Sequence, residues 1–229
     1  MAASRASPLP SARAALGWRL GLGAALLVAA AWIFGAIAED VVTGDRLTVV
    51  DAAVAAWLHS HASPPLTRAM LAWTDLHSTI AVGTYTALIA LVLAARKRWR
   101  TFVFVIVAAG GGLALNVLMK LAFHRARPAF ADPLVTLGTY SFPSGHVAGS
   151  TILYGFAVLW VFARTRRALW RTLALLGAAL AIALVGFSRM VLGVHYLSDV
   201  GAAFAEGVAW LVICDAALAA FWREAAGRP

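Results

Sequence analysis

The chain has 229 residues, of which 62% are hydrophobic and only 13% are charged. Soluble domains are about half apolar and a quarter charged, so this composition excludes an ordinary soluble protein and predicts one embedded in lipid. The formal net charge of +9 does not indicate nucleic-acid binding. The basic residues gather in short clusters between apolar stretches, where positive charge holds a loop in the cytoplasm.

Six apolar stretches follow one another along the chain. A transmembrane helix needs about 20 mostly apolar residues, and six such runs leave no room for a separate soluble domain. We therefore predict one all-α, polytopic membrane domain over residues 1–229. The predicted spans are Leu20–Ala38, Thr79–Ala95, Thr101–Phe123, Val147–Ala163, Thr172–Met190 and Val200–Phe221.

Basic residues set the predicted orientation. Arg5, Arg13 and Arg19 precede the first stretch and place the N-terminus in the cytoplasm. Further basic clusters, Arg96–Arg100 and Arg164–Arg171, follow the second and fourth stretches, on the same side. Because the number of crossings is even, the C-terminus is also predicted to be cytoplasmic.

The first stretch also resembles a signal peptide, with basic residues, an apolar run and then Ala36-Ile37-Ala38. The run from Leu20 to Gly35 is at the long end for such a peptide, and its removal would leave five spans. We therefore expect it to be retained as the first helix.

The external segment Glu39–Ser78 carries mixed charges. Its apolar portion, Val49–Leu58, predicts a short interfacial or half-inserted helix, and Pro64-Pro65 is expected to stop any helix there. Histidines two apart in such a loop are more often solvated than metal-bound. We therefore predict solvated side chains for His59, His61 and His77.

Some residues within the stretches indicate packing. Gly110-Gly111-Gly112 is expected to permit close helix contact or a bend. Asn116 and Glu206 are candidates for helix pairing or for support of a site, since polar groups are costly in lipid. Cys214 is the only cysteine, which excludes an intrachain disulfide, and it is expected to pack in the last span.

The remaining polar residues converge on the extracytoplasmic ends of the third to sixth stretches. Three of them are cations, and arginine forks match phosphate oxygens two at a time. The start of the fourth stretch adds free backbone N–H groups and the positive end of a helix dipole, which also favour an anion. A phosphoryl group is the predicted occupant of a site built from Lys120, Arg127, Ser144, Gly145, His146, Arg189, His195 and Asp199.

Two histidines and a carboxylate predict the chemistry of this site. His195 and Asp199 are four residues apart and share one face of a helix. A carboxylate that binds one imidazole nitrogen leaves the other as an oriented nucleophile. His146 is then the candidate acid for the departing oxygen, because a lipid alkoxide is a poor leaving group.

These residues resemble the signature of the type 2 phosphatidic acid phosphatase (PAP2) superfamily, which reads here as Lys120-x6-Arg127-Pro128, Pro143-Ser144-Gly145-His146 and Ser188-Arg189-x5-His195-x3-Asp199. The resemblance implies hydrolysis of a lipid phosphate through a phosphohistidine, without a metal or other cofactor. It implies that His195 is the nucleophile, His146 the acid–base and Asp199 the orienting partner. It also implies a phosphate cradle of Lys120, Arg127, Ser144, Gly145 and Arg189.

Several alternatives remain open at this point. Arg125 is either a contact to the substrate head group or an exposed residue. The substrate is a polyprenyl pyrophosphate, phosphatidylglycerophosphate, phosphatidic acid or a lipid A phosphate in a bacterial cytoplasmic membrane. A phosphotransferase with the same intermediate is the alternative enzyme, and a non-catalytic lipid-binding or transport protein is the remote one. No feature of the sequence assigns an oligomeric state.

Overall fold

The computed structural model describes residues 12–226, which include no strand. Arg5, used above for orientation, lies outside this range. The helices in chain order are α1 (Ala12–Thr43), α2 (Arg46–Ser60), α3 (Pro64–Asp75), α4 (Thr79–Ala95), α5 (Trp99–Phe123), α6 (Gly145–Arg164), α7 (Ala168–Val191) and α8 (Leu197–Ala226).

Within residues 12–226, six helical segments are long and apolar enough to cross a membrane, which confirms the predicted all-α, six-span architecture. The second of these segments joins α3 to α4, and the others lie in α1, α5, α6, α7 and α8. Many large apolar side chains are exposed on them, such as Ile80 at 83% and Trp32 at 73%. Such exposure suits helices whose outer faces meet lipid.

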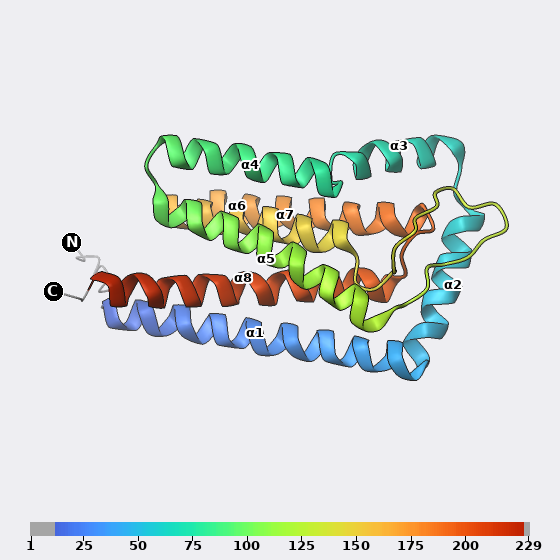
Figure 1. The fold of residues 1–229 in the computed structure, drawn as a ribbon, viewed down its shortest axis with the longest axis horizontal. Coiled ribbons are helices and arrows are strands. Elements are labelled where there is room, and N and C mark those ends of the chain that lie inside the picture. Colours follow the sequence, from blue (N-terminus) through green and yellow to red (C-terminus); the bar gives the residue numbers. More distant parts are fainter. Residues whose placement is uncertain (1–11, 227–229) are drawn as a thin grey trace, which may run out of the picture.

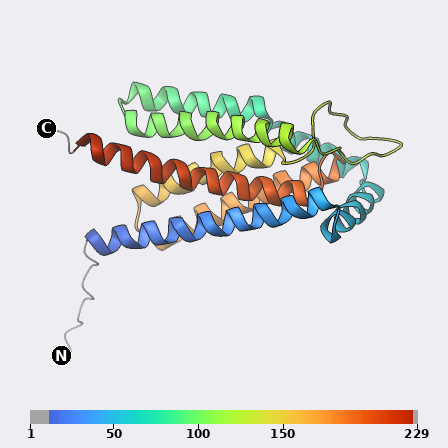
Figure 2. The same cartoon turned by 60° about the horizontal axis from the view of Figure 1, so that its bottom comes forward.

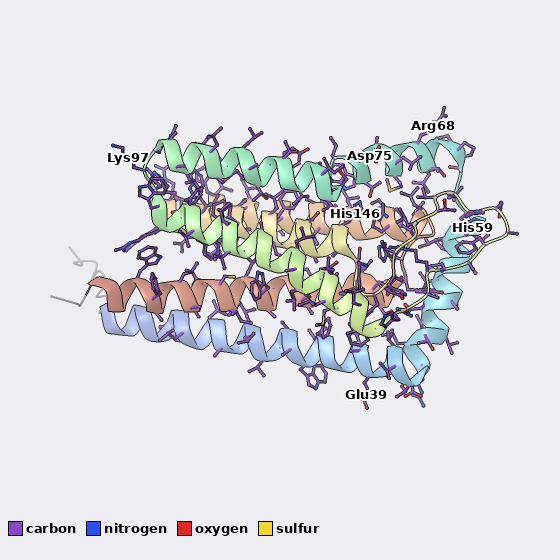
Figure 3. All side chains as sticks on the ribbon, viewed as in Figure 1. Glu39, His59, Arg68, Asp75, Lys97 and His146 are labelled. Atoms are coloured by element: carbon purple, nitrogen blue, oxygen red, sulfur yellow. The ribbon has the colours of Figure 1, made fainter. Side chains whose placement is uncertain are left out.

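The helices run roughly alongside one another, with α2 lying across one end (Figure 1). α1 packs along α8 in both views (Figures 1 and 2). The start of α1 and the end of α8 lie at the opposite end from α2 (Figure 1). Lys97, between α4 and α5, also lies at the end away from α2 (Figure 3). The two basic loops and the helix ends thus have the arrangement that the charge pattern predicts.

The external segment differs from its prediction in one respect. Val49–Leu58 is helical, as part of α2, but a further helix, α3, starts at Pro64. Pro64 and Pro65 occupy its first positions. Backbone N–H groups there have no partner within the helix, so the missing N–H of proline costs no hydrogen bond. The prolines therefore separate two helices instead of ending helical structure.

Glycines allow the closest helix contacts in the bundle. A side chain at Gly111 would overlap the indole of Trp210, one at Gly112 would overlap Ile152, and one at Gly207 would overlap Thr151. The Trp210 indole N–H donates to the Ala108 carbonyl at 2.9 Å, which ties α8 to α5. Close contact through Gly111 and Gly112 is thus confirmed. A side chain at Gly110 would instead meet open space.

The fold predicts which loops are accessible from outside the cell. In a chain with Cys214→Ala, we expect Ala131→Cys or Gly138→Cys to react with a membrane-impermeant maleimide added to intact cells. Arg166→Cys, at the other end of the bundle, should react only after the cells are opened. The opposite labelling pattern would place the polar end of the bundle in the cytoplasm.

Candidate functional site

All the predicted site residues lie at the end of the bundle that α2 crosses. Lys120 is in the last turn of α5, and residues 145 and 146 open α6. Arg189 is in the last turn of α7, and Asp199 is in the first turn of α8. Residues 124–144 between α5 and α6, here named the strap, reach over this end toward α2 (Figure 1). Helix ends thus bring together residues that are far apart in sequence.

His195 and Asp199 form the predicted pair. The imidazole Nδ1–H donates to Asp199 Oδ2 at 3.2 Å, and both side chains are buried. The backbone N–H of Tyr196 donates to the same oxygen at 2.9 Å, so Asp199 also fixes the turn that carries the histidine. Arg127 Nη1 lies 3.2 Å from His195 Nε2 and can only donate to it. This leaves Nε2 as the nitrogen with a lone pair, beside a cation.

Burial also sets the protonation of His195. The pKa of the imidazole is lowered to about 4, mainly because burial removes the ring from water. The hydrogen bond and the charge of Asp199 raise the pKa, but by less than burial lowers it. The charges of Arg127 and Arg189 lower it further. The imidazole is therefore neutral near pH 7, the state in which a histidine nitrogen can act as a nucleophile.

The strap holds two of the three cations. Lys120 Nζ donates to the carbonyls of Tyr140 and Ser141, at 2.8 and 3.2 Å. The Arg127 guanidinium donates to Thr139 O at 2.7 Å and to Val194 O at 2.6 Å, which joins the strap to the turn before α8. Both cations are thereby fixed by the strap, and Arg127 is held against His195.

Two buried polar atoms at the site have no hydrogen-bond partner within the described residues. They are Ser144 Oγ, at the N-cap of α6, and Arg189 Nε. Arg189 is held on its other side by Thr74 of α3, whose hydroxyl accepts from Nη1 at 2.9 Å. An unmet donor on a buried arginine costs free energy unless an occupant supplies the acceptor. The first N–H groups of α6 also lack acceptors within the helix, because no helical carbonyl precedes them.

His146 opens α6 and lies within electrostatic range of Arg189, His195 and Arg127. Beneath it, Asn116 Nδ2 donates to Glu206 Oε2 at 3.0 Å and pairs α5 with α8. A side chain on Gly145 would lie 3.2 Å from Asn116 Oδ1. Of the two roles expected for Asn116 and Glu206, helix pairing or support of a site, this hydrogen bond shows helix pairing, close to the start of α6.

Arg125 lies beside the site with its guanidinium bound to carboxylates. It donates to Asp199 Oδ1 at 2.7 Å and to Asp51 Oδ2 at 2.8 Å, and its side chain is only 12% exposed. Of the two alternatives for Arg125, surface exposure is wrong. Contact with a head group stays a prediction.

The prediction of solvated histidines was wrong for two of the three. His77 is buried and contacts the Trp73 carbonyl and the Tyr154 hydroxyl, at 2.8 and 2.7 Å. His59 contacts Asp132 of the strap at 3.0 Å and stacks on a nearby phenyl ring. His61 remains at the surface, against the ring of Trp57. Within residues 12–226, no group of three or more His, Cys, Asp or Glu side chains is placed to hold a metal ion.

A cavity of about 210 Å³ runs from the site between α4, α5 and α6. His77, Asn116 and Gly145 line its polar end, and Gly83, Gly110 and Gly149 are among the residues that line the rest. On α4 the lining extends from Thr79 to Thr86, about 10 Å along the helix. The cavity thus extends from Gly145, at the start of α6, into the membrane-spanning part of the bundle.

Comparison with known proteins gives consistent matches. Residues 101–223 match the model of the PAP2 superfamily. A segment is 32% identical over 114 residues to phosphatidylglycerophosphatase B of Bacillus subtilis, covering 49% of this chain and 55% of that protein. The matched part is therefore about half the length of that relative. The crystal structure of a transmembrane PAP2-type phosphatidylglycerolphosphate phosphatase from Bacillus subtilis superposes with a TM-score of 0.74, at 25% identity, over 86% of this chain and 96% of that one.

If the site hydrolyses a phosphate ester, as the sequence signature predicts, the low pKa of His195 implies a wide pH range for that reaction. Since the neutral imidazole is required, kcat/KM should fall only as the pH drops toward about 4. Asp199→Asn removes a charge that raises this pKa and should move the acid limb to lower pH. The measurement is hydrolysis of p-nitrophenyl phosphate, corrected for titration of the substrate itself. An acid limb near the ordinary histidine value would contradict the assignment.

Proposed function

Because the chain belongs to the PAP2 superfamily, we propose that it is a membrane phosphatase that hydrolyses a lipid phosphate, with phosphatidylglycerophosphate as its substrate. One observation carries the proposal. The lone pair of His195 Nε2 lies beside Arg127, in a buried site where Ser144 Oγ and Arg189 Nε have no hydrogen-bond partner among residues 12–226. A phosphate monoester supplies acceptors for the arginine and the amides and an electrophilic phosphorus for the imidazole.

The mechanism follows from the two histidines. His195 Nε2 attacks phosphorus, the bond from phosphorus to the lipid oxygen breaks, and His146 donates a proton to that oxygen. Water then attacks the phosphohistidine, His146 takes its proton, and the P–N bond breaks to release inorganic phosphate and neutral His195. Asp199 stabilises the positive charge that develops on the imidazole in the first step. All the positive charge in this scheme comes from side chains and backbone N–H groups, so we expect no metal requirement.

The cavity supports a lipid substrate over a soluble one. Its polar end adjoins Gly145, and its remainder lies among apolar and glycine residues of membrane-spanning helices. A head group in the cradle can therefore keep its hydrocarbon chain in an apolar channel. Among lipid phosphates, the relatives favour phosphatidylglycerophosphate, since both carry that activity in their names. We further propose that the site faces the outside of a bacterial cytoplasmic membrane.

The first test of function compares four lipids. Purified protein in detergent and excess EDTA is expected to release phosphate from phosphatidylglycerophosphate with a higher kcat/KM than from phosphatidic acid, undecaprenyl pyrophosphate or a lipid A phosphate. His195→Ala should abolish turnover and the labelled phosphoenzyme seen after alkaline quenching. His146→Ala should lose about 10²–10⁴-fold with lipid, and less with p-nitrophenyl phosphate, whose leaving group departs without a proton.

Each of these measurements has an outcome that would contradict one part of the proposal. Loss of activity in EDTA with recovery on added magnesium would refute metal independence. Label on a residue other than His195 would refute the mechanism but leave the phosphatase assignment. A preference for another of the four lipids would correct the substrate alone.

The second test fills the cavity. Gly110→Leu projects a side chain into open space that lines the cavity, so we expect a higher KM for long-chain substrates and little change for a short-chain phosphate. Gly177→Leu is the matched control, because its added side chain also meets open space but lies on α7, away from the cavity. Equal effects on long and short chains would show that the hydrocarbon chain lies elsewhere.

A further inference from the structure

We propose that Asp51 and Arg125 are positioning residues for catalysis, which hold Asp199 so that His195 keeps its reactive orientation. This inference rests on the proposed function, and it assigns a role to α2. Asp51 lies outside residues 101–223, the part of the chain that matches the family. It is a single carboxylate within the apolar portion of α2, and it is completely buried.

Arg125 connects the two carboxylates. Its Nη1 donates to Asp199 Oδ1 at 2.7 Å and its Nη2 donates to Asp51 Oδ2 at 2.8 Å. Both aspartates have 0% exposure in their side chains. The guanidinium also lies over the ring of Tyr196, 4.3 Å from its centroid. A planar fork with donors on two edges is needed for this bridge, and a lysine cannot reproduce it.

Asp51 makes a second connection, to the start of α8. Its Oδ1 accepts the backbone N–H of Ser198 at 2.9 Å, and its Oδ2 accepts the Ser198 hydroxyl. Arg125 Nη1 in turn donates to that hydroxyl oxygen at 2.6 Å. A residue of α2 thus fixes both the arginine that binds Asp199 and the backbone next to Asp199.

The two oxygens of Asp199 consequently have different partners. Oδ1 binds Arg125, whereas Oδ2 accepts from His195, from Tyr196 N–H and from the Ser141 hydroxyl. Rotation of the carboxylate would break bonds at both oxygens. The bridge therefore sets the direction from which Asp199 meets Nδ1, and hence the direction of the Nε2 lone pair.

Asp51 has a further consequence for the charges at the site. Arg125 is only two residues from Arg127, which contacts His195. Without Asp51, one edge of the Arg125 guanidinium would have no carboxylate, and a phosphate would be its natural acceptor. By binding Arg125, Asp51 thus keeps this guanidinium on Asp199. Phosphate is then bound by the cations of the cradle, which are Lys120, Arg127 and Arg189.

The competing explanation is that this network only fastens α2 to the bundle. A fastening role predicts lower thermal stability but normal turnover in the protein that remains folded. A positioning role predicts lower kcat in folded protein, with KM less affected, because the lost interaction orients the nucleophile.

The experiment measures kcat and KM for phosphate release from phosphatidylglycerophosphate by the full chain. Asp51→Asn and Arg125→Lys are expected to lower kcat about 10–100-fold, the usual effect of removing a partner that orients a functional histidine, with KM changed less than about threefold. Asp45→Asn is the matched control, since Asp45 is the exposed N-cap of the same helix and asparagine also caps. Unchanged kcat in folded Asp51→Asn protein would overturn the proposal.

A double-mutant cycle tests the route through Asp199. If Asp51 acts through Asp199, adding Asp51→Asn to Asp199→Asn should lower kcat by less than about threefold further, because the coupling is already lost. Independent roles would instead multiply the two losses, which would refute the inference. The cycle is repeated with p-nitrophenyl phosphate, so that a wrong lipid assignment affects only the first substrate.

A readout without turnover separates this inference from the proposed function. The imidazole ¹⁵N shifts of His195, assigned with His195→Gln, should report a proton on Nδ1 in the native chain. Asp51→Asn should shift the signal toward the other tautomer or a mixture, and Asp45→Asn should not. If the native chain hydrolyses no phosphate ester, the proposed function fails and this measurement still decides the role of Asp51.

Discussion

The carboxylate of Asp199 is buried at the end of the bundle, and a charge removed from water is stable only when it has partners on every side. Those partners come from separate parts of the chain. The strap supplies Arg125 and Ser141, and the turn before α8 supplies His195 and the backbone N–H of Tyr196. The hydrogen bonds that stabilise this one carboxylate therefore connect the strap to the start of α8. Arg125 extends the same network to Asp51 of α2.

Much of the fold could be predicted from the sequence, because a membrane-spanning helix is recognised from a single continuous stretch of apolar residues. An apolar run long enough to cross a membrane is visible in the run itself, and each predicted span lies within one helix of the structure. α4 agrees at both ends, and α5 begins only two residues before its prediction. The location of the site could be predicted in the same way, because the direction of each helix alone brings Lys120, His146 and Asp199 to one end of the bundle.

The errors arise where the decisive contact is distant in sequence. Asp51 pairs with Arg125 and Ser198, and nothing near Asp51 indicates either partner. His77 was taken as solvated because it follows an external segment, whereas Tyr154 of α6 provides its buried partner. For Asp51 a signal did exist. A lone carboxylate in an apolar helix segment is costly, and its presence there indicates a buried partner.

The strap bonds of Lys120 and Arg127 have a consequence for the end of the proposed catalytic cycle. Both side chains donate to carbonyls of the strap. An incoming phosphate therefore exchanges one set of acceptors for another, and the net gain on binding is smaller than the strength of the new bonds. The same exchange runs backward after hydrolysis, when the carbonyls compete with inorganic phosphate for the donors. In the proposed reaction, the strap carbonyls would therefore compete with the phosphate product for these two side chains and favour its release.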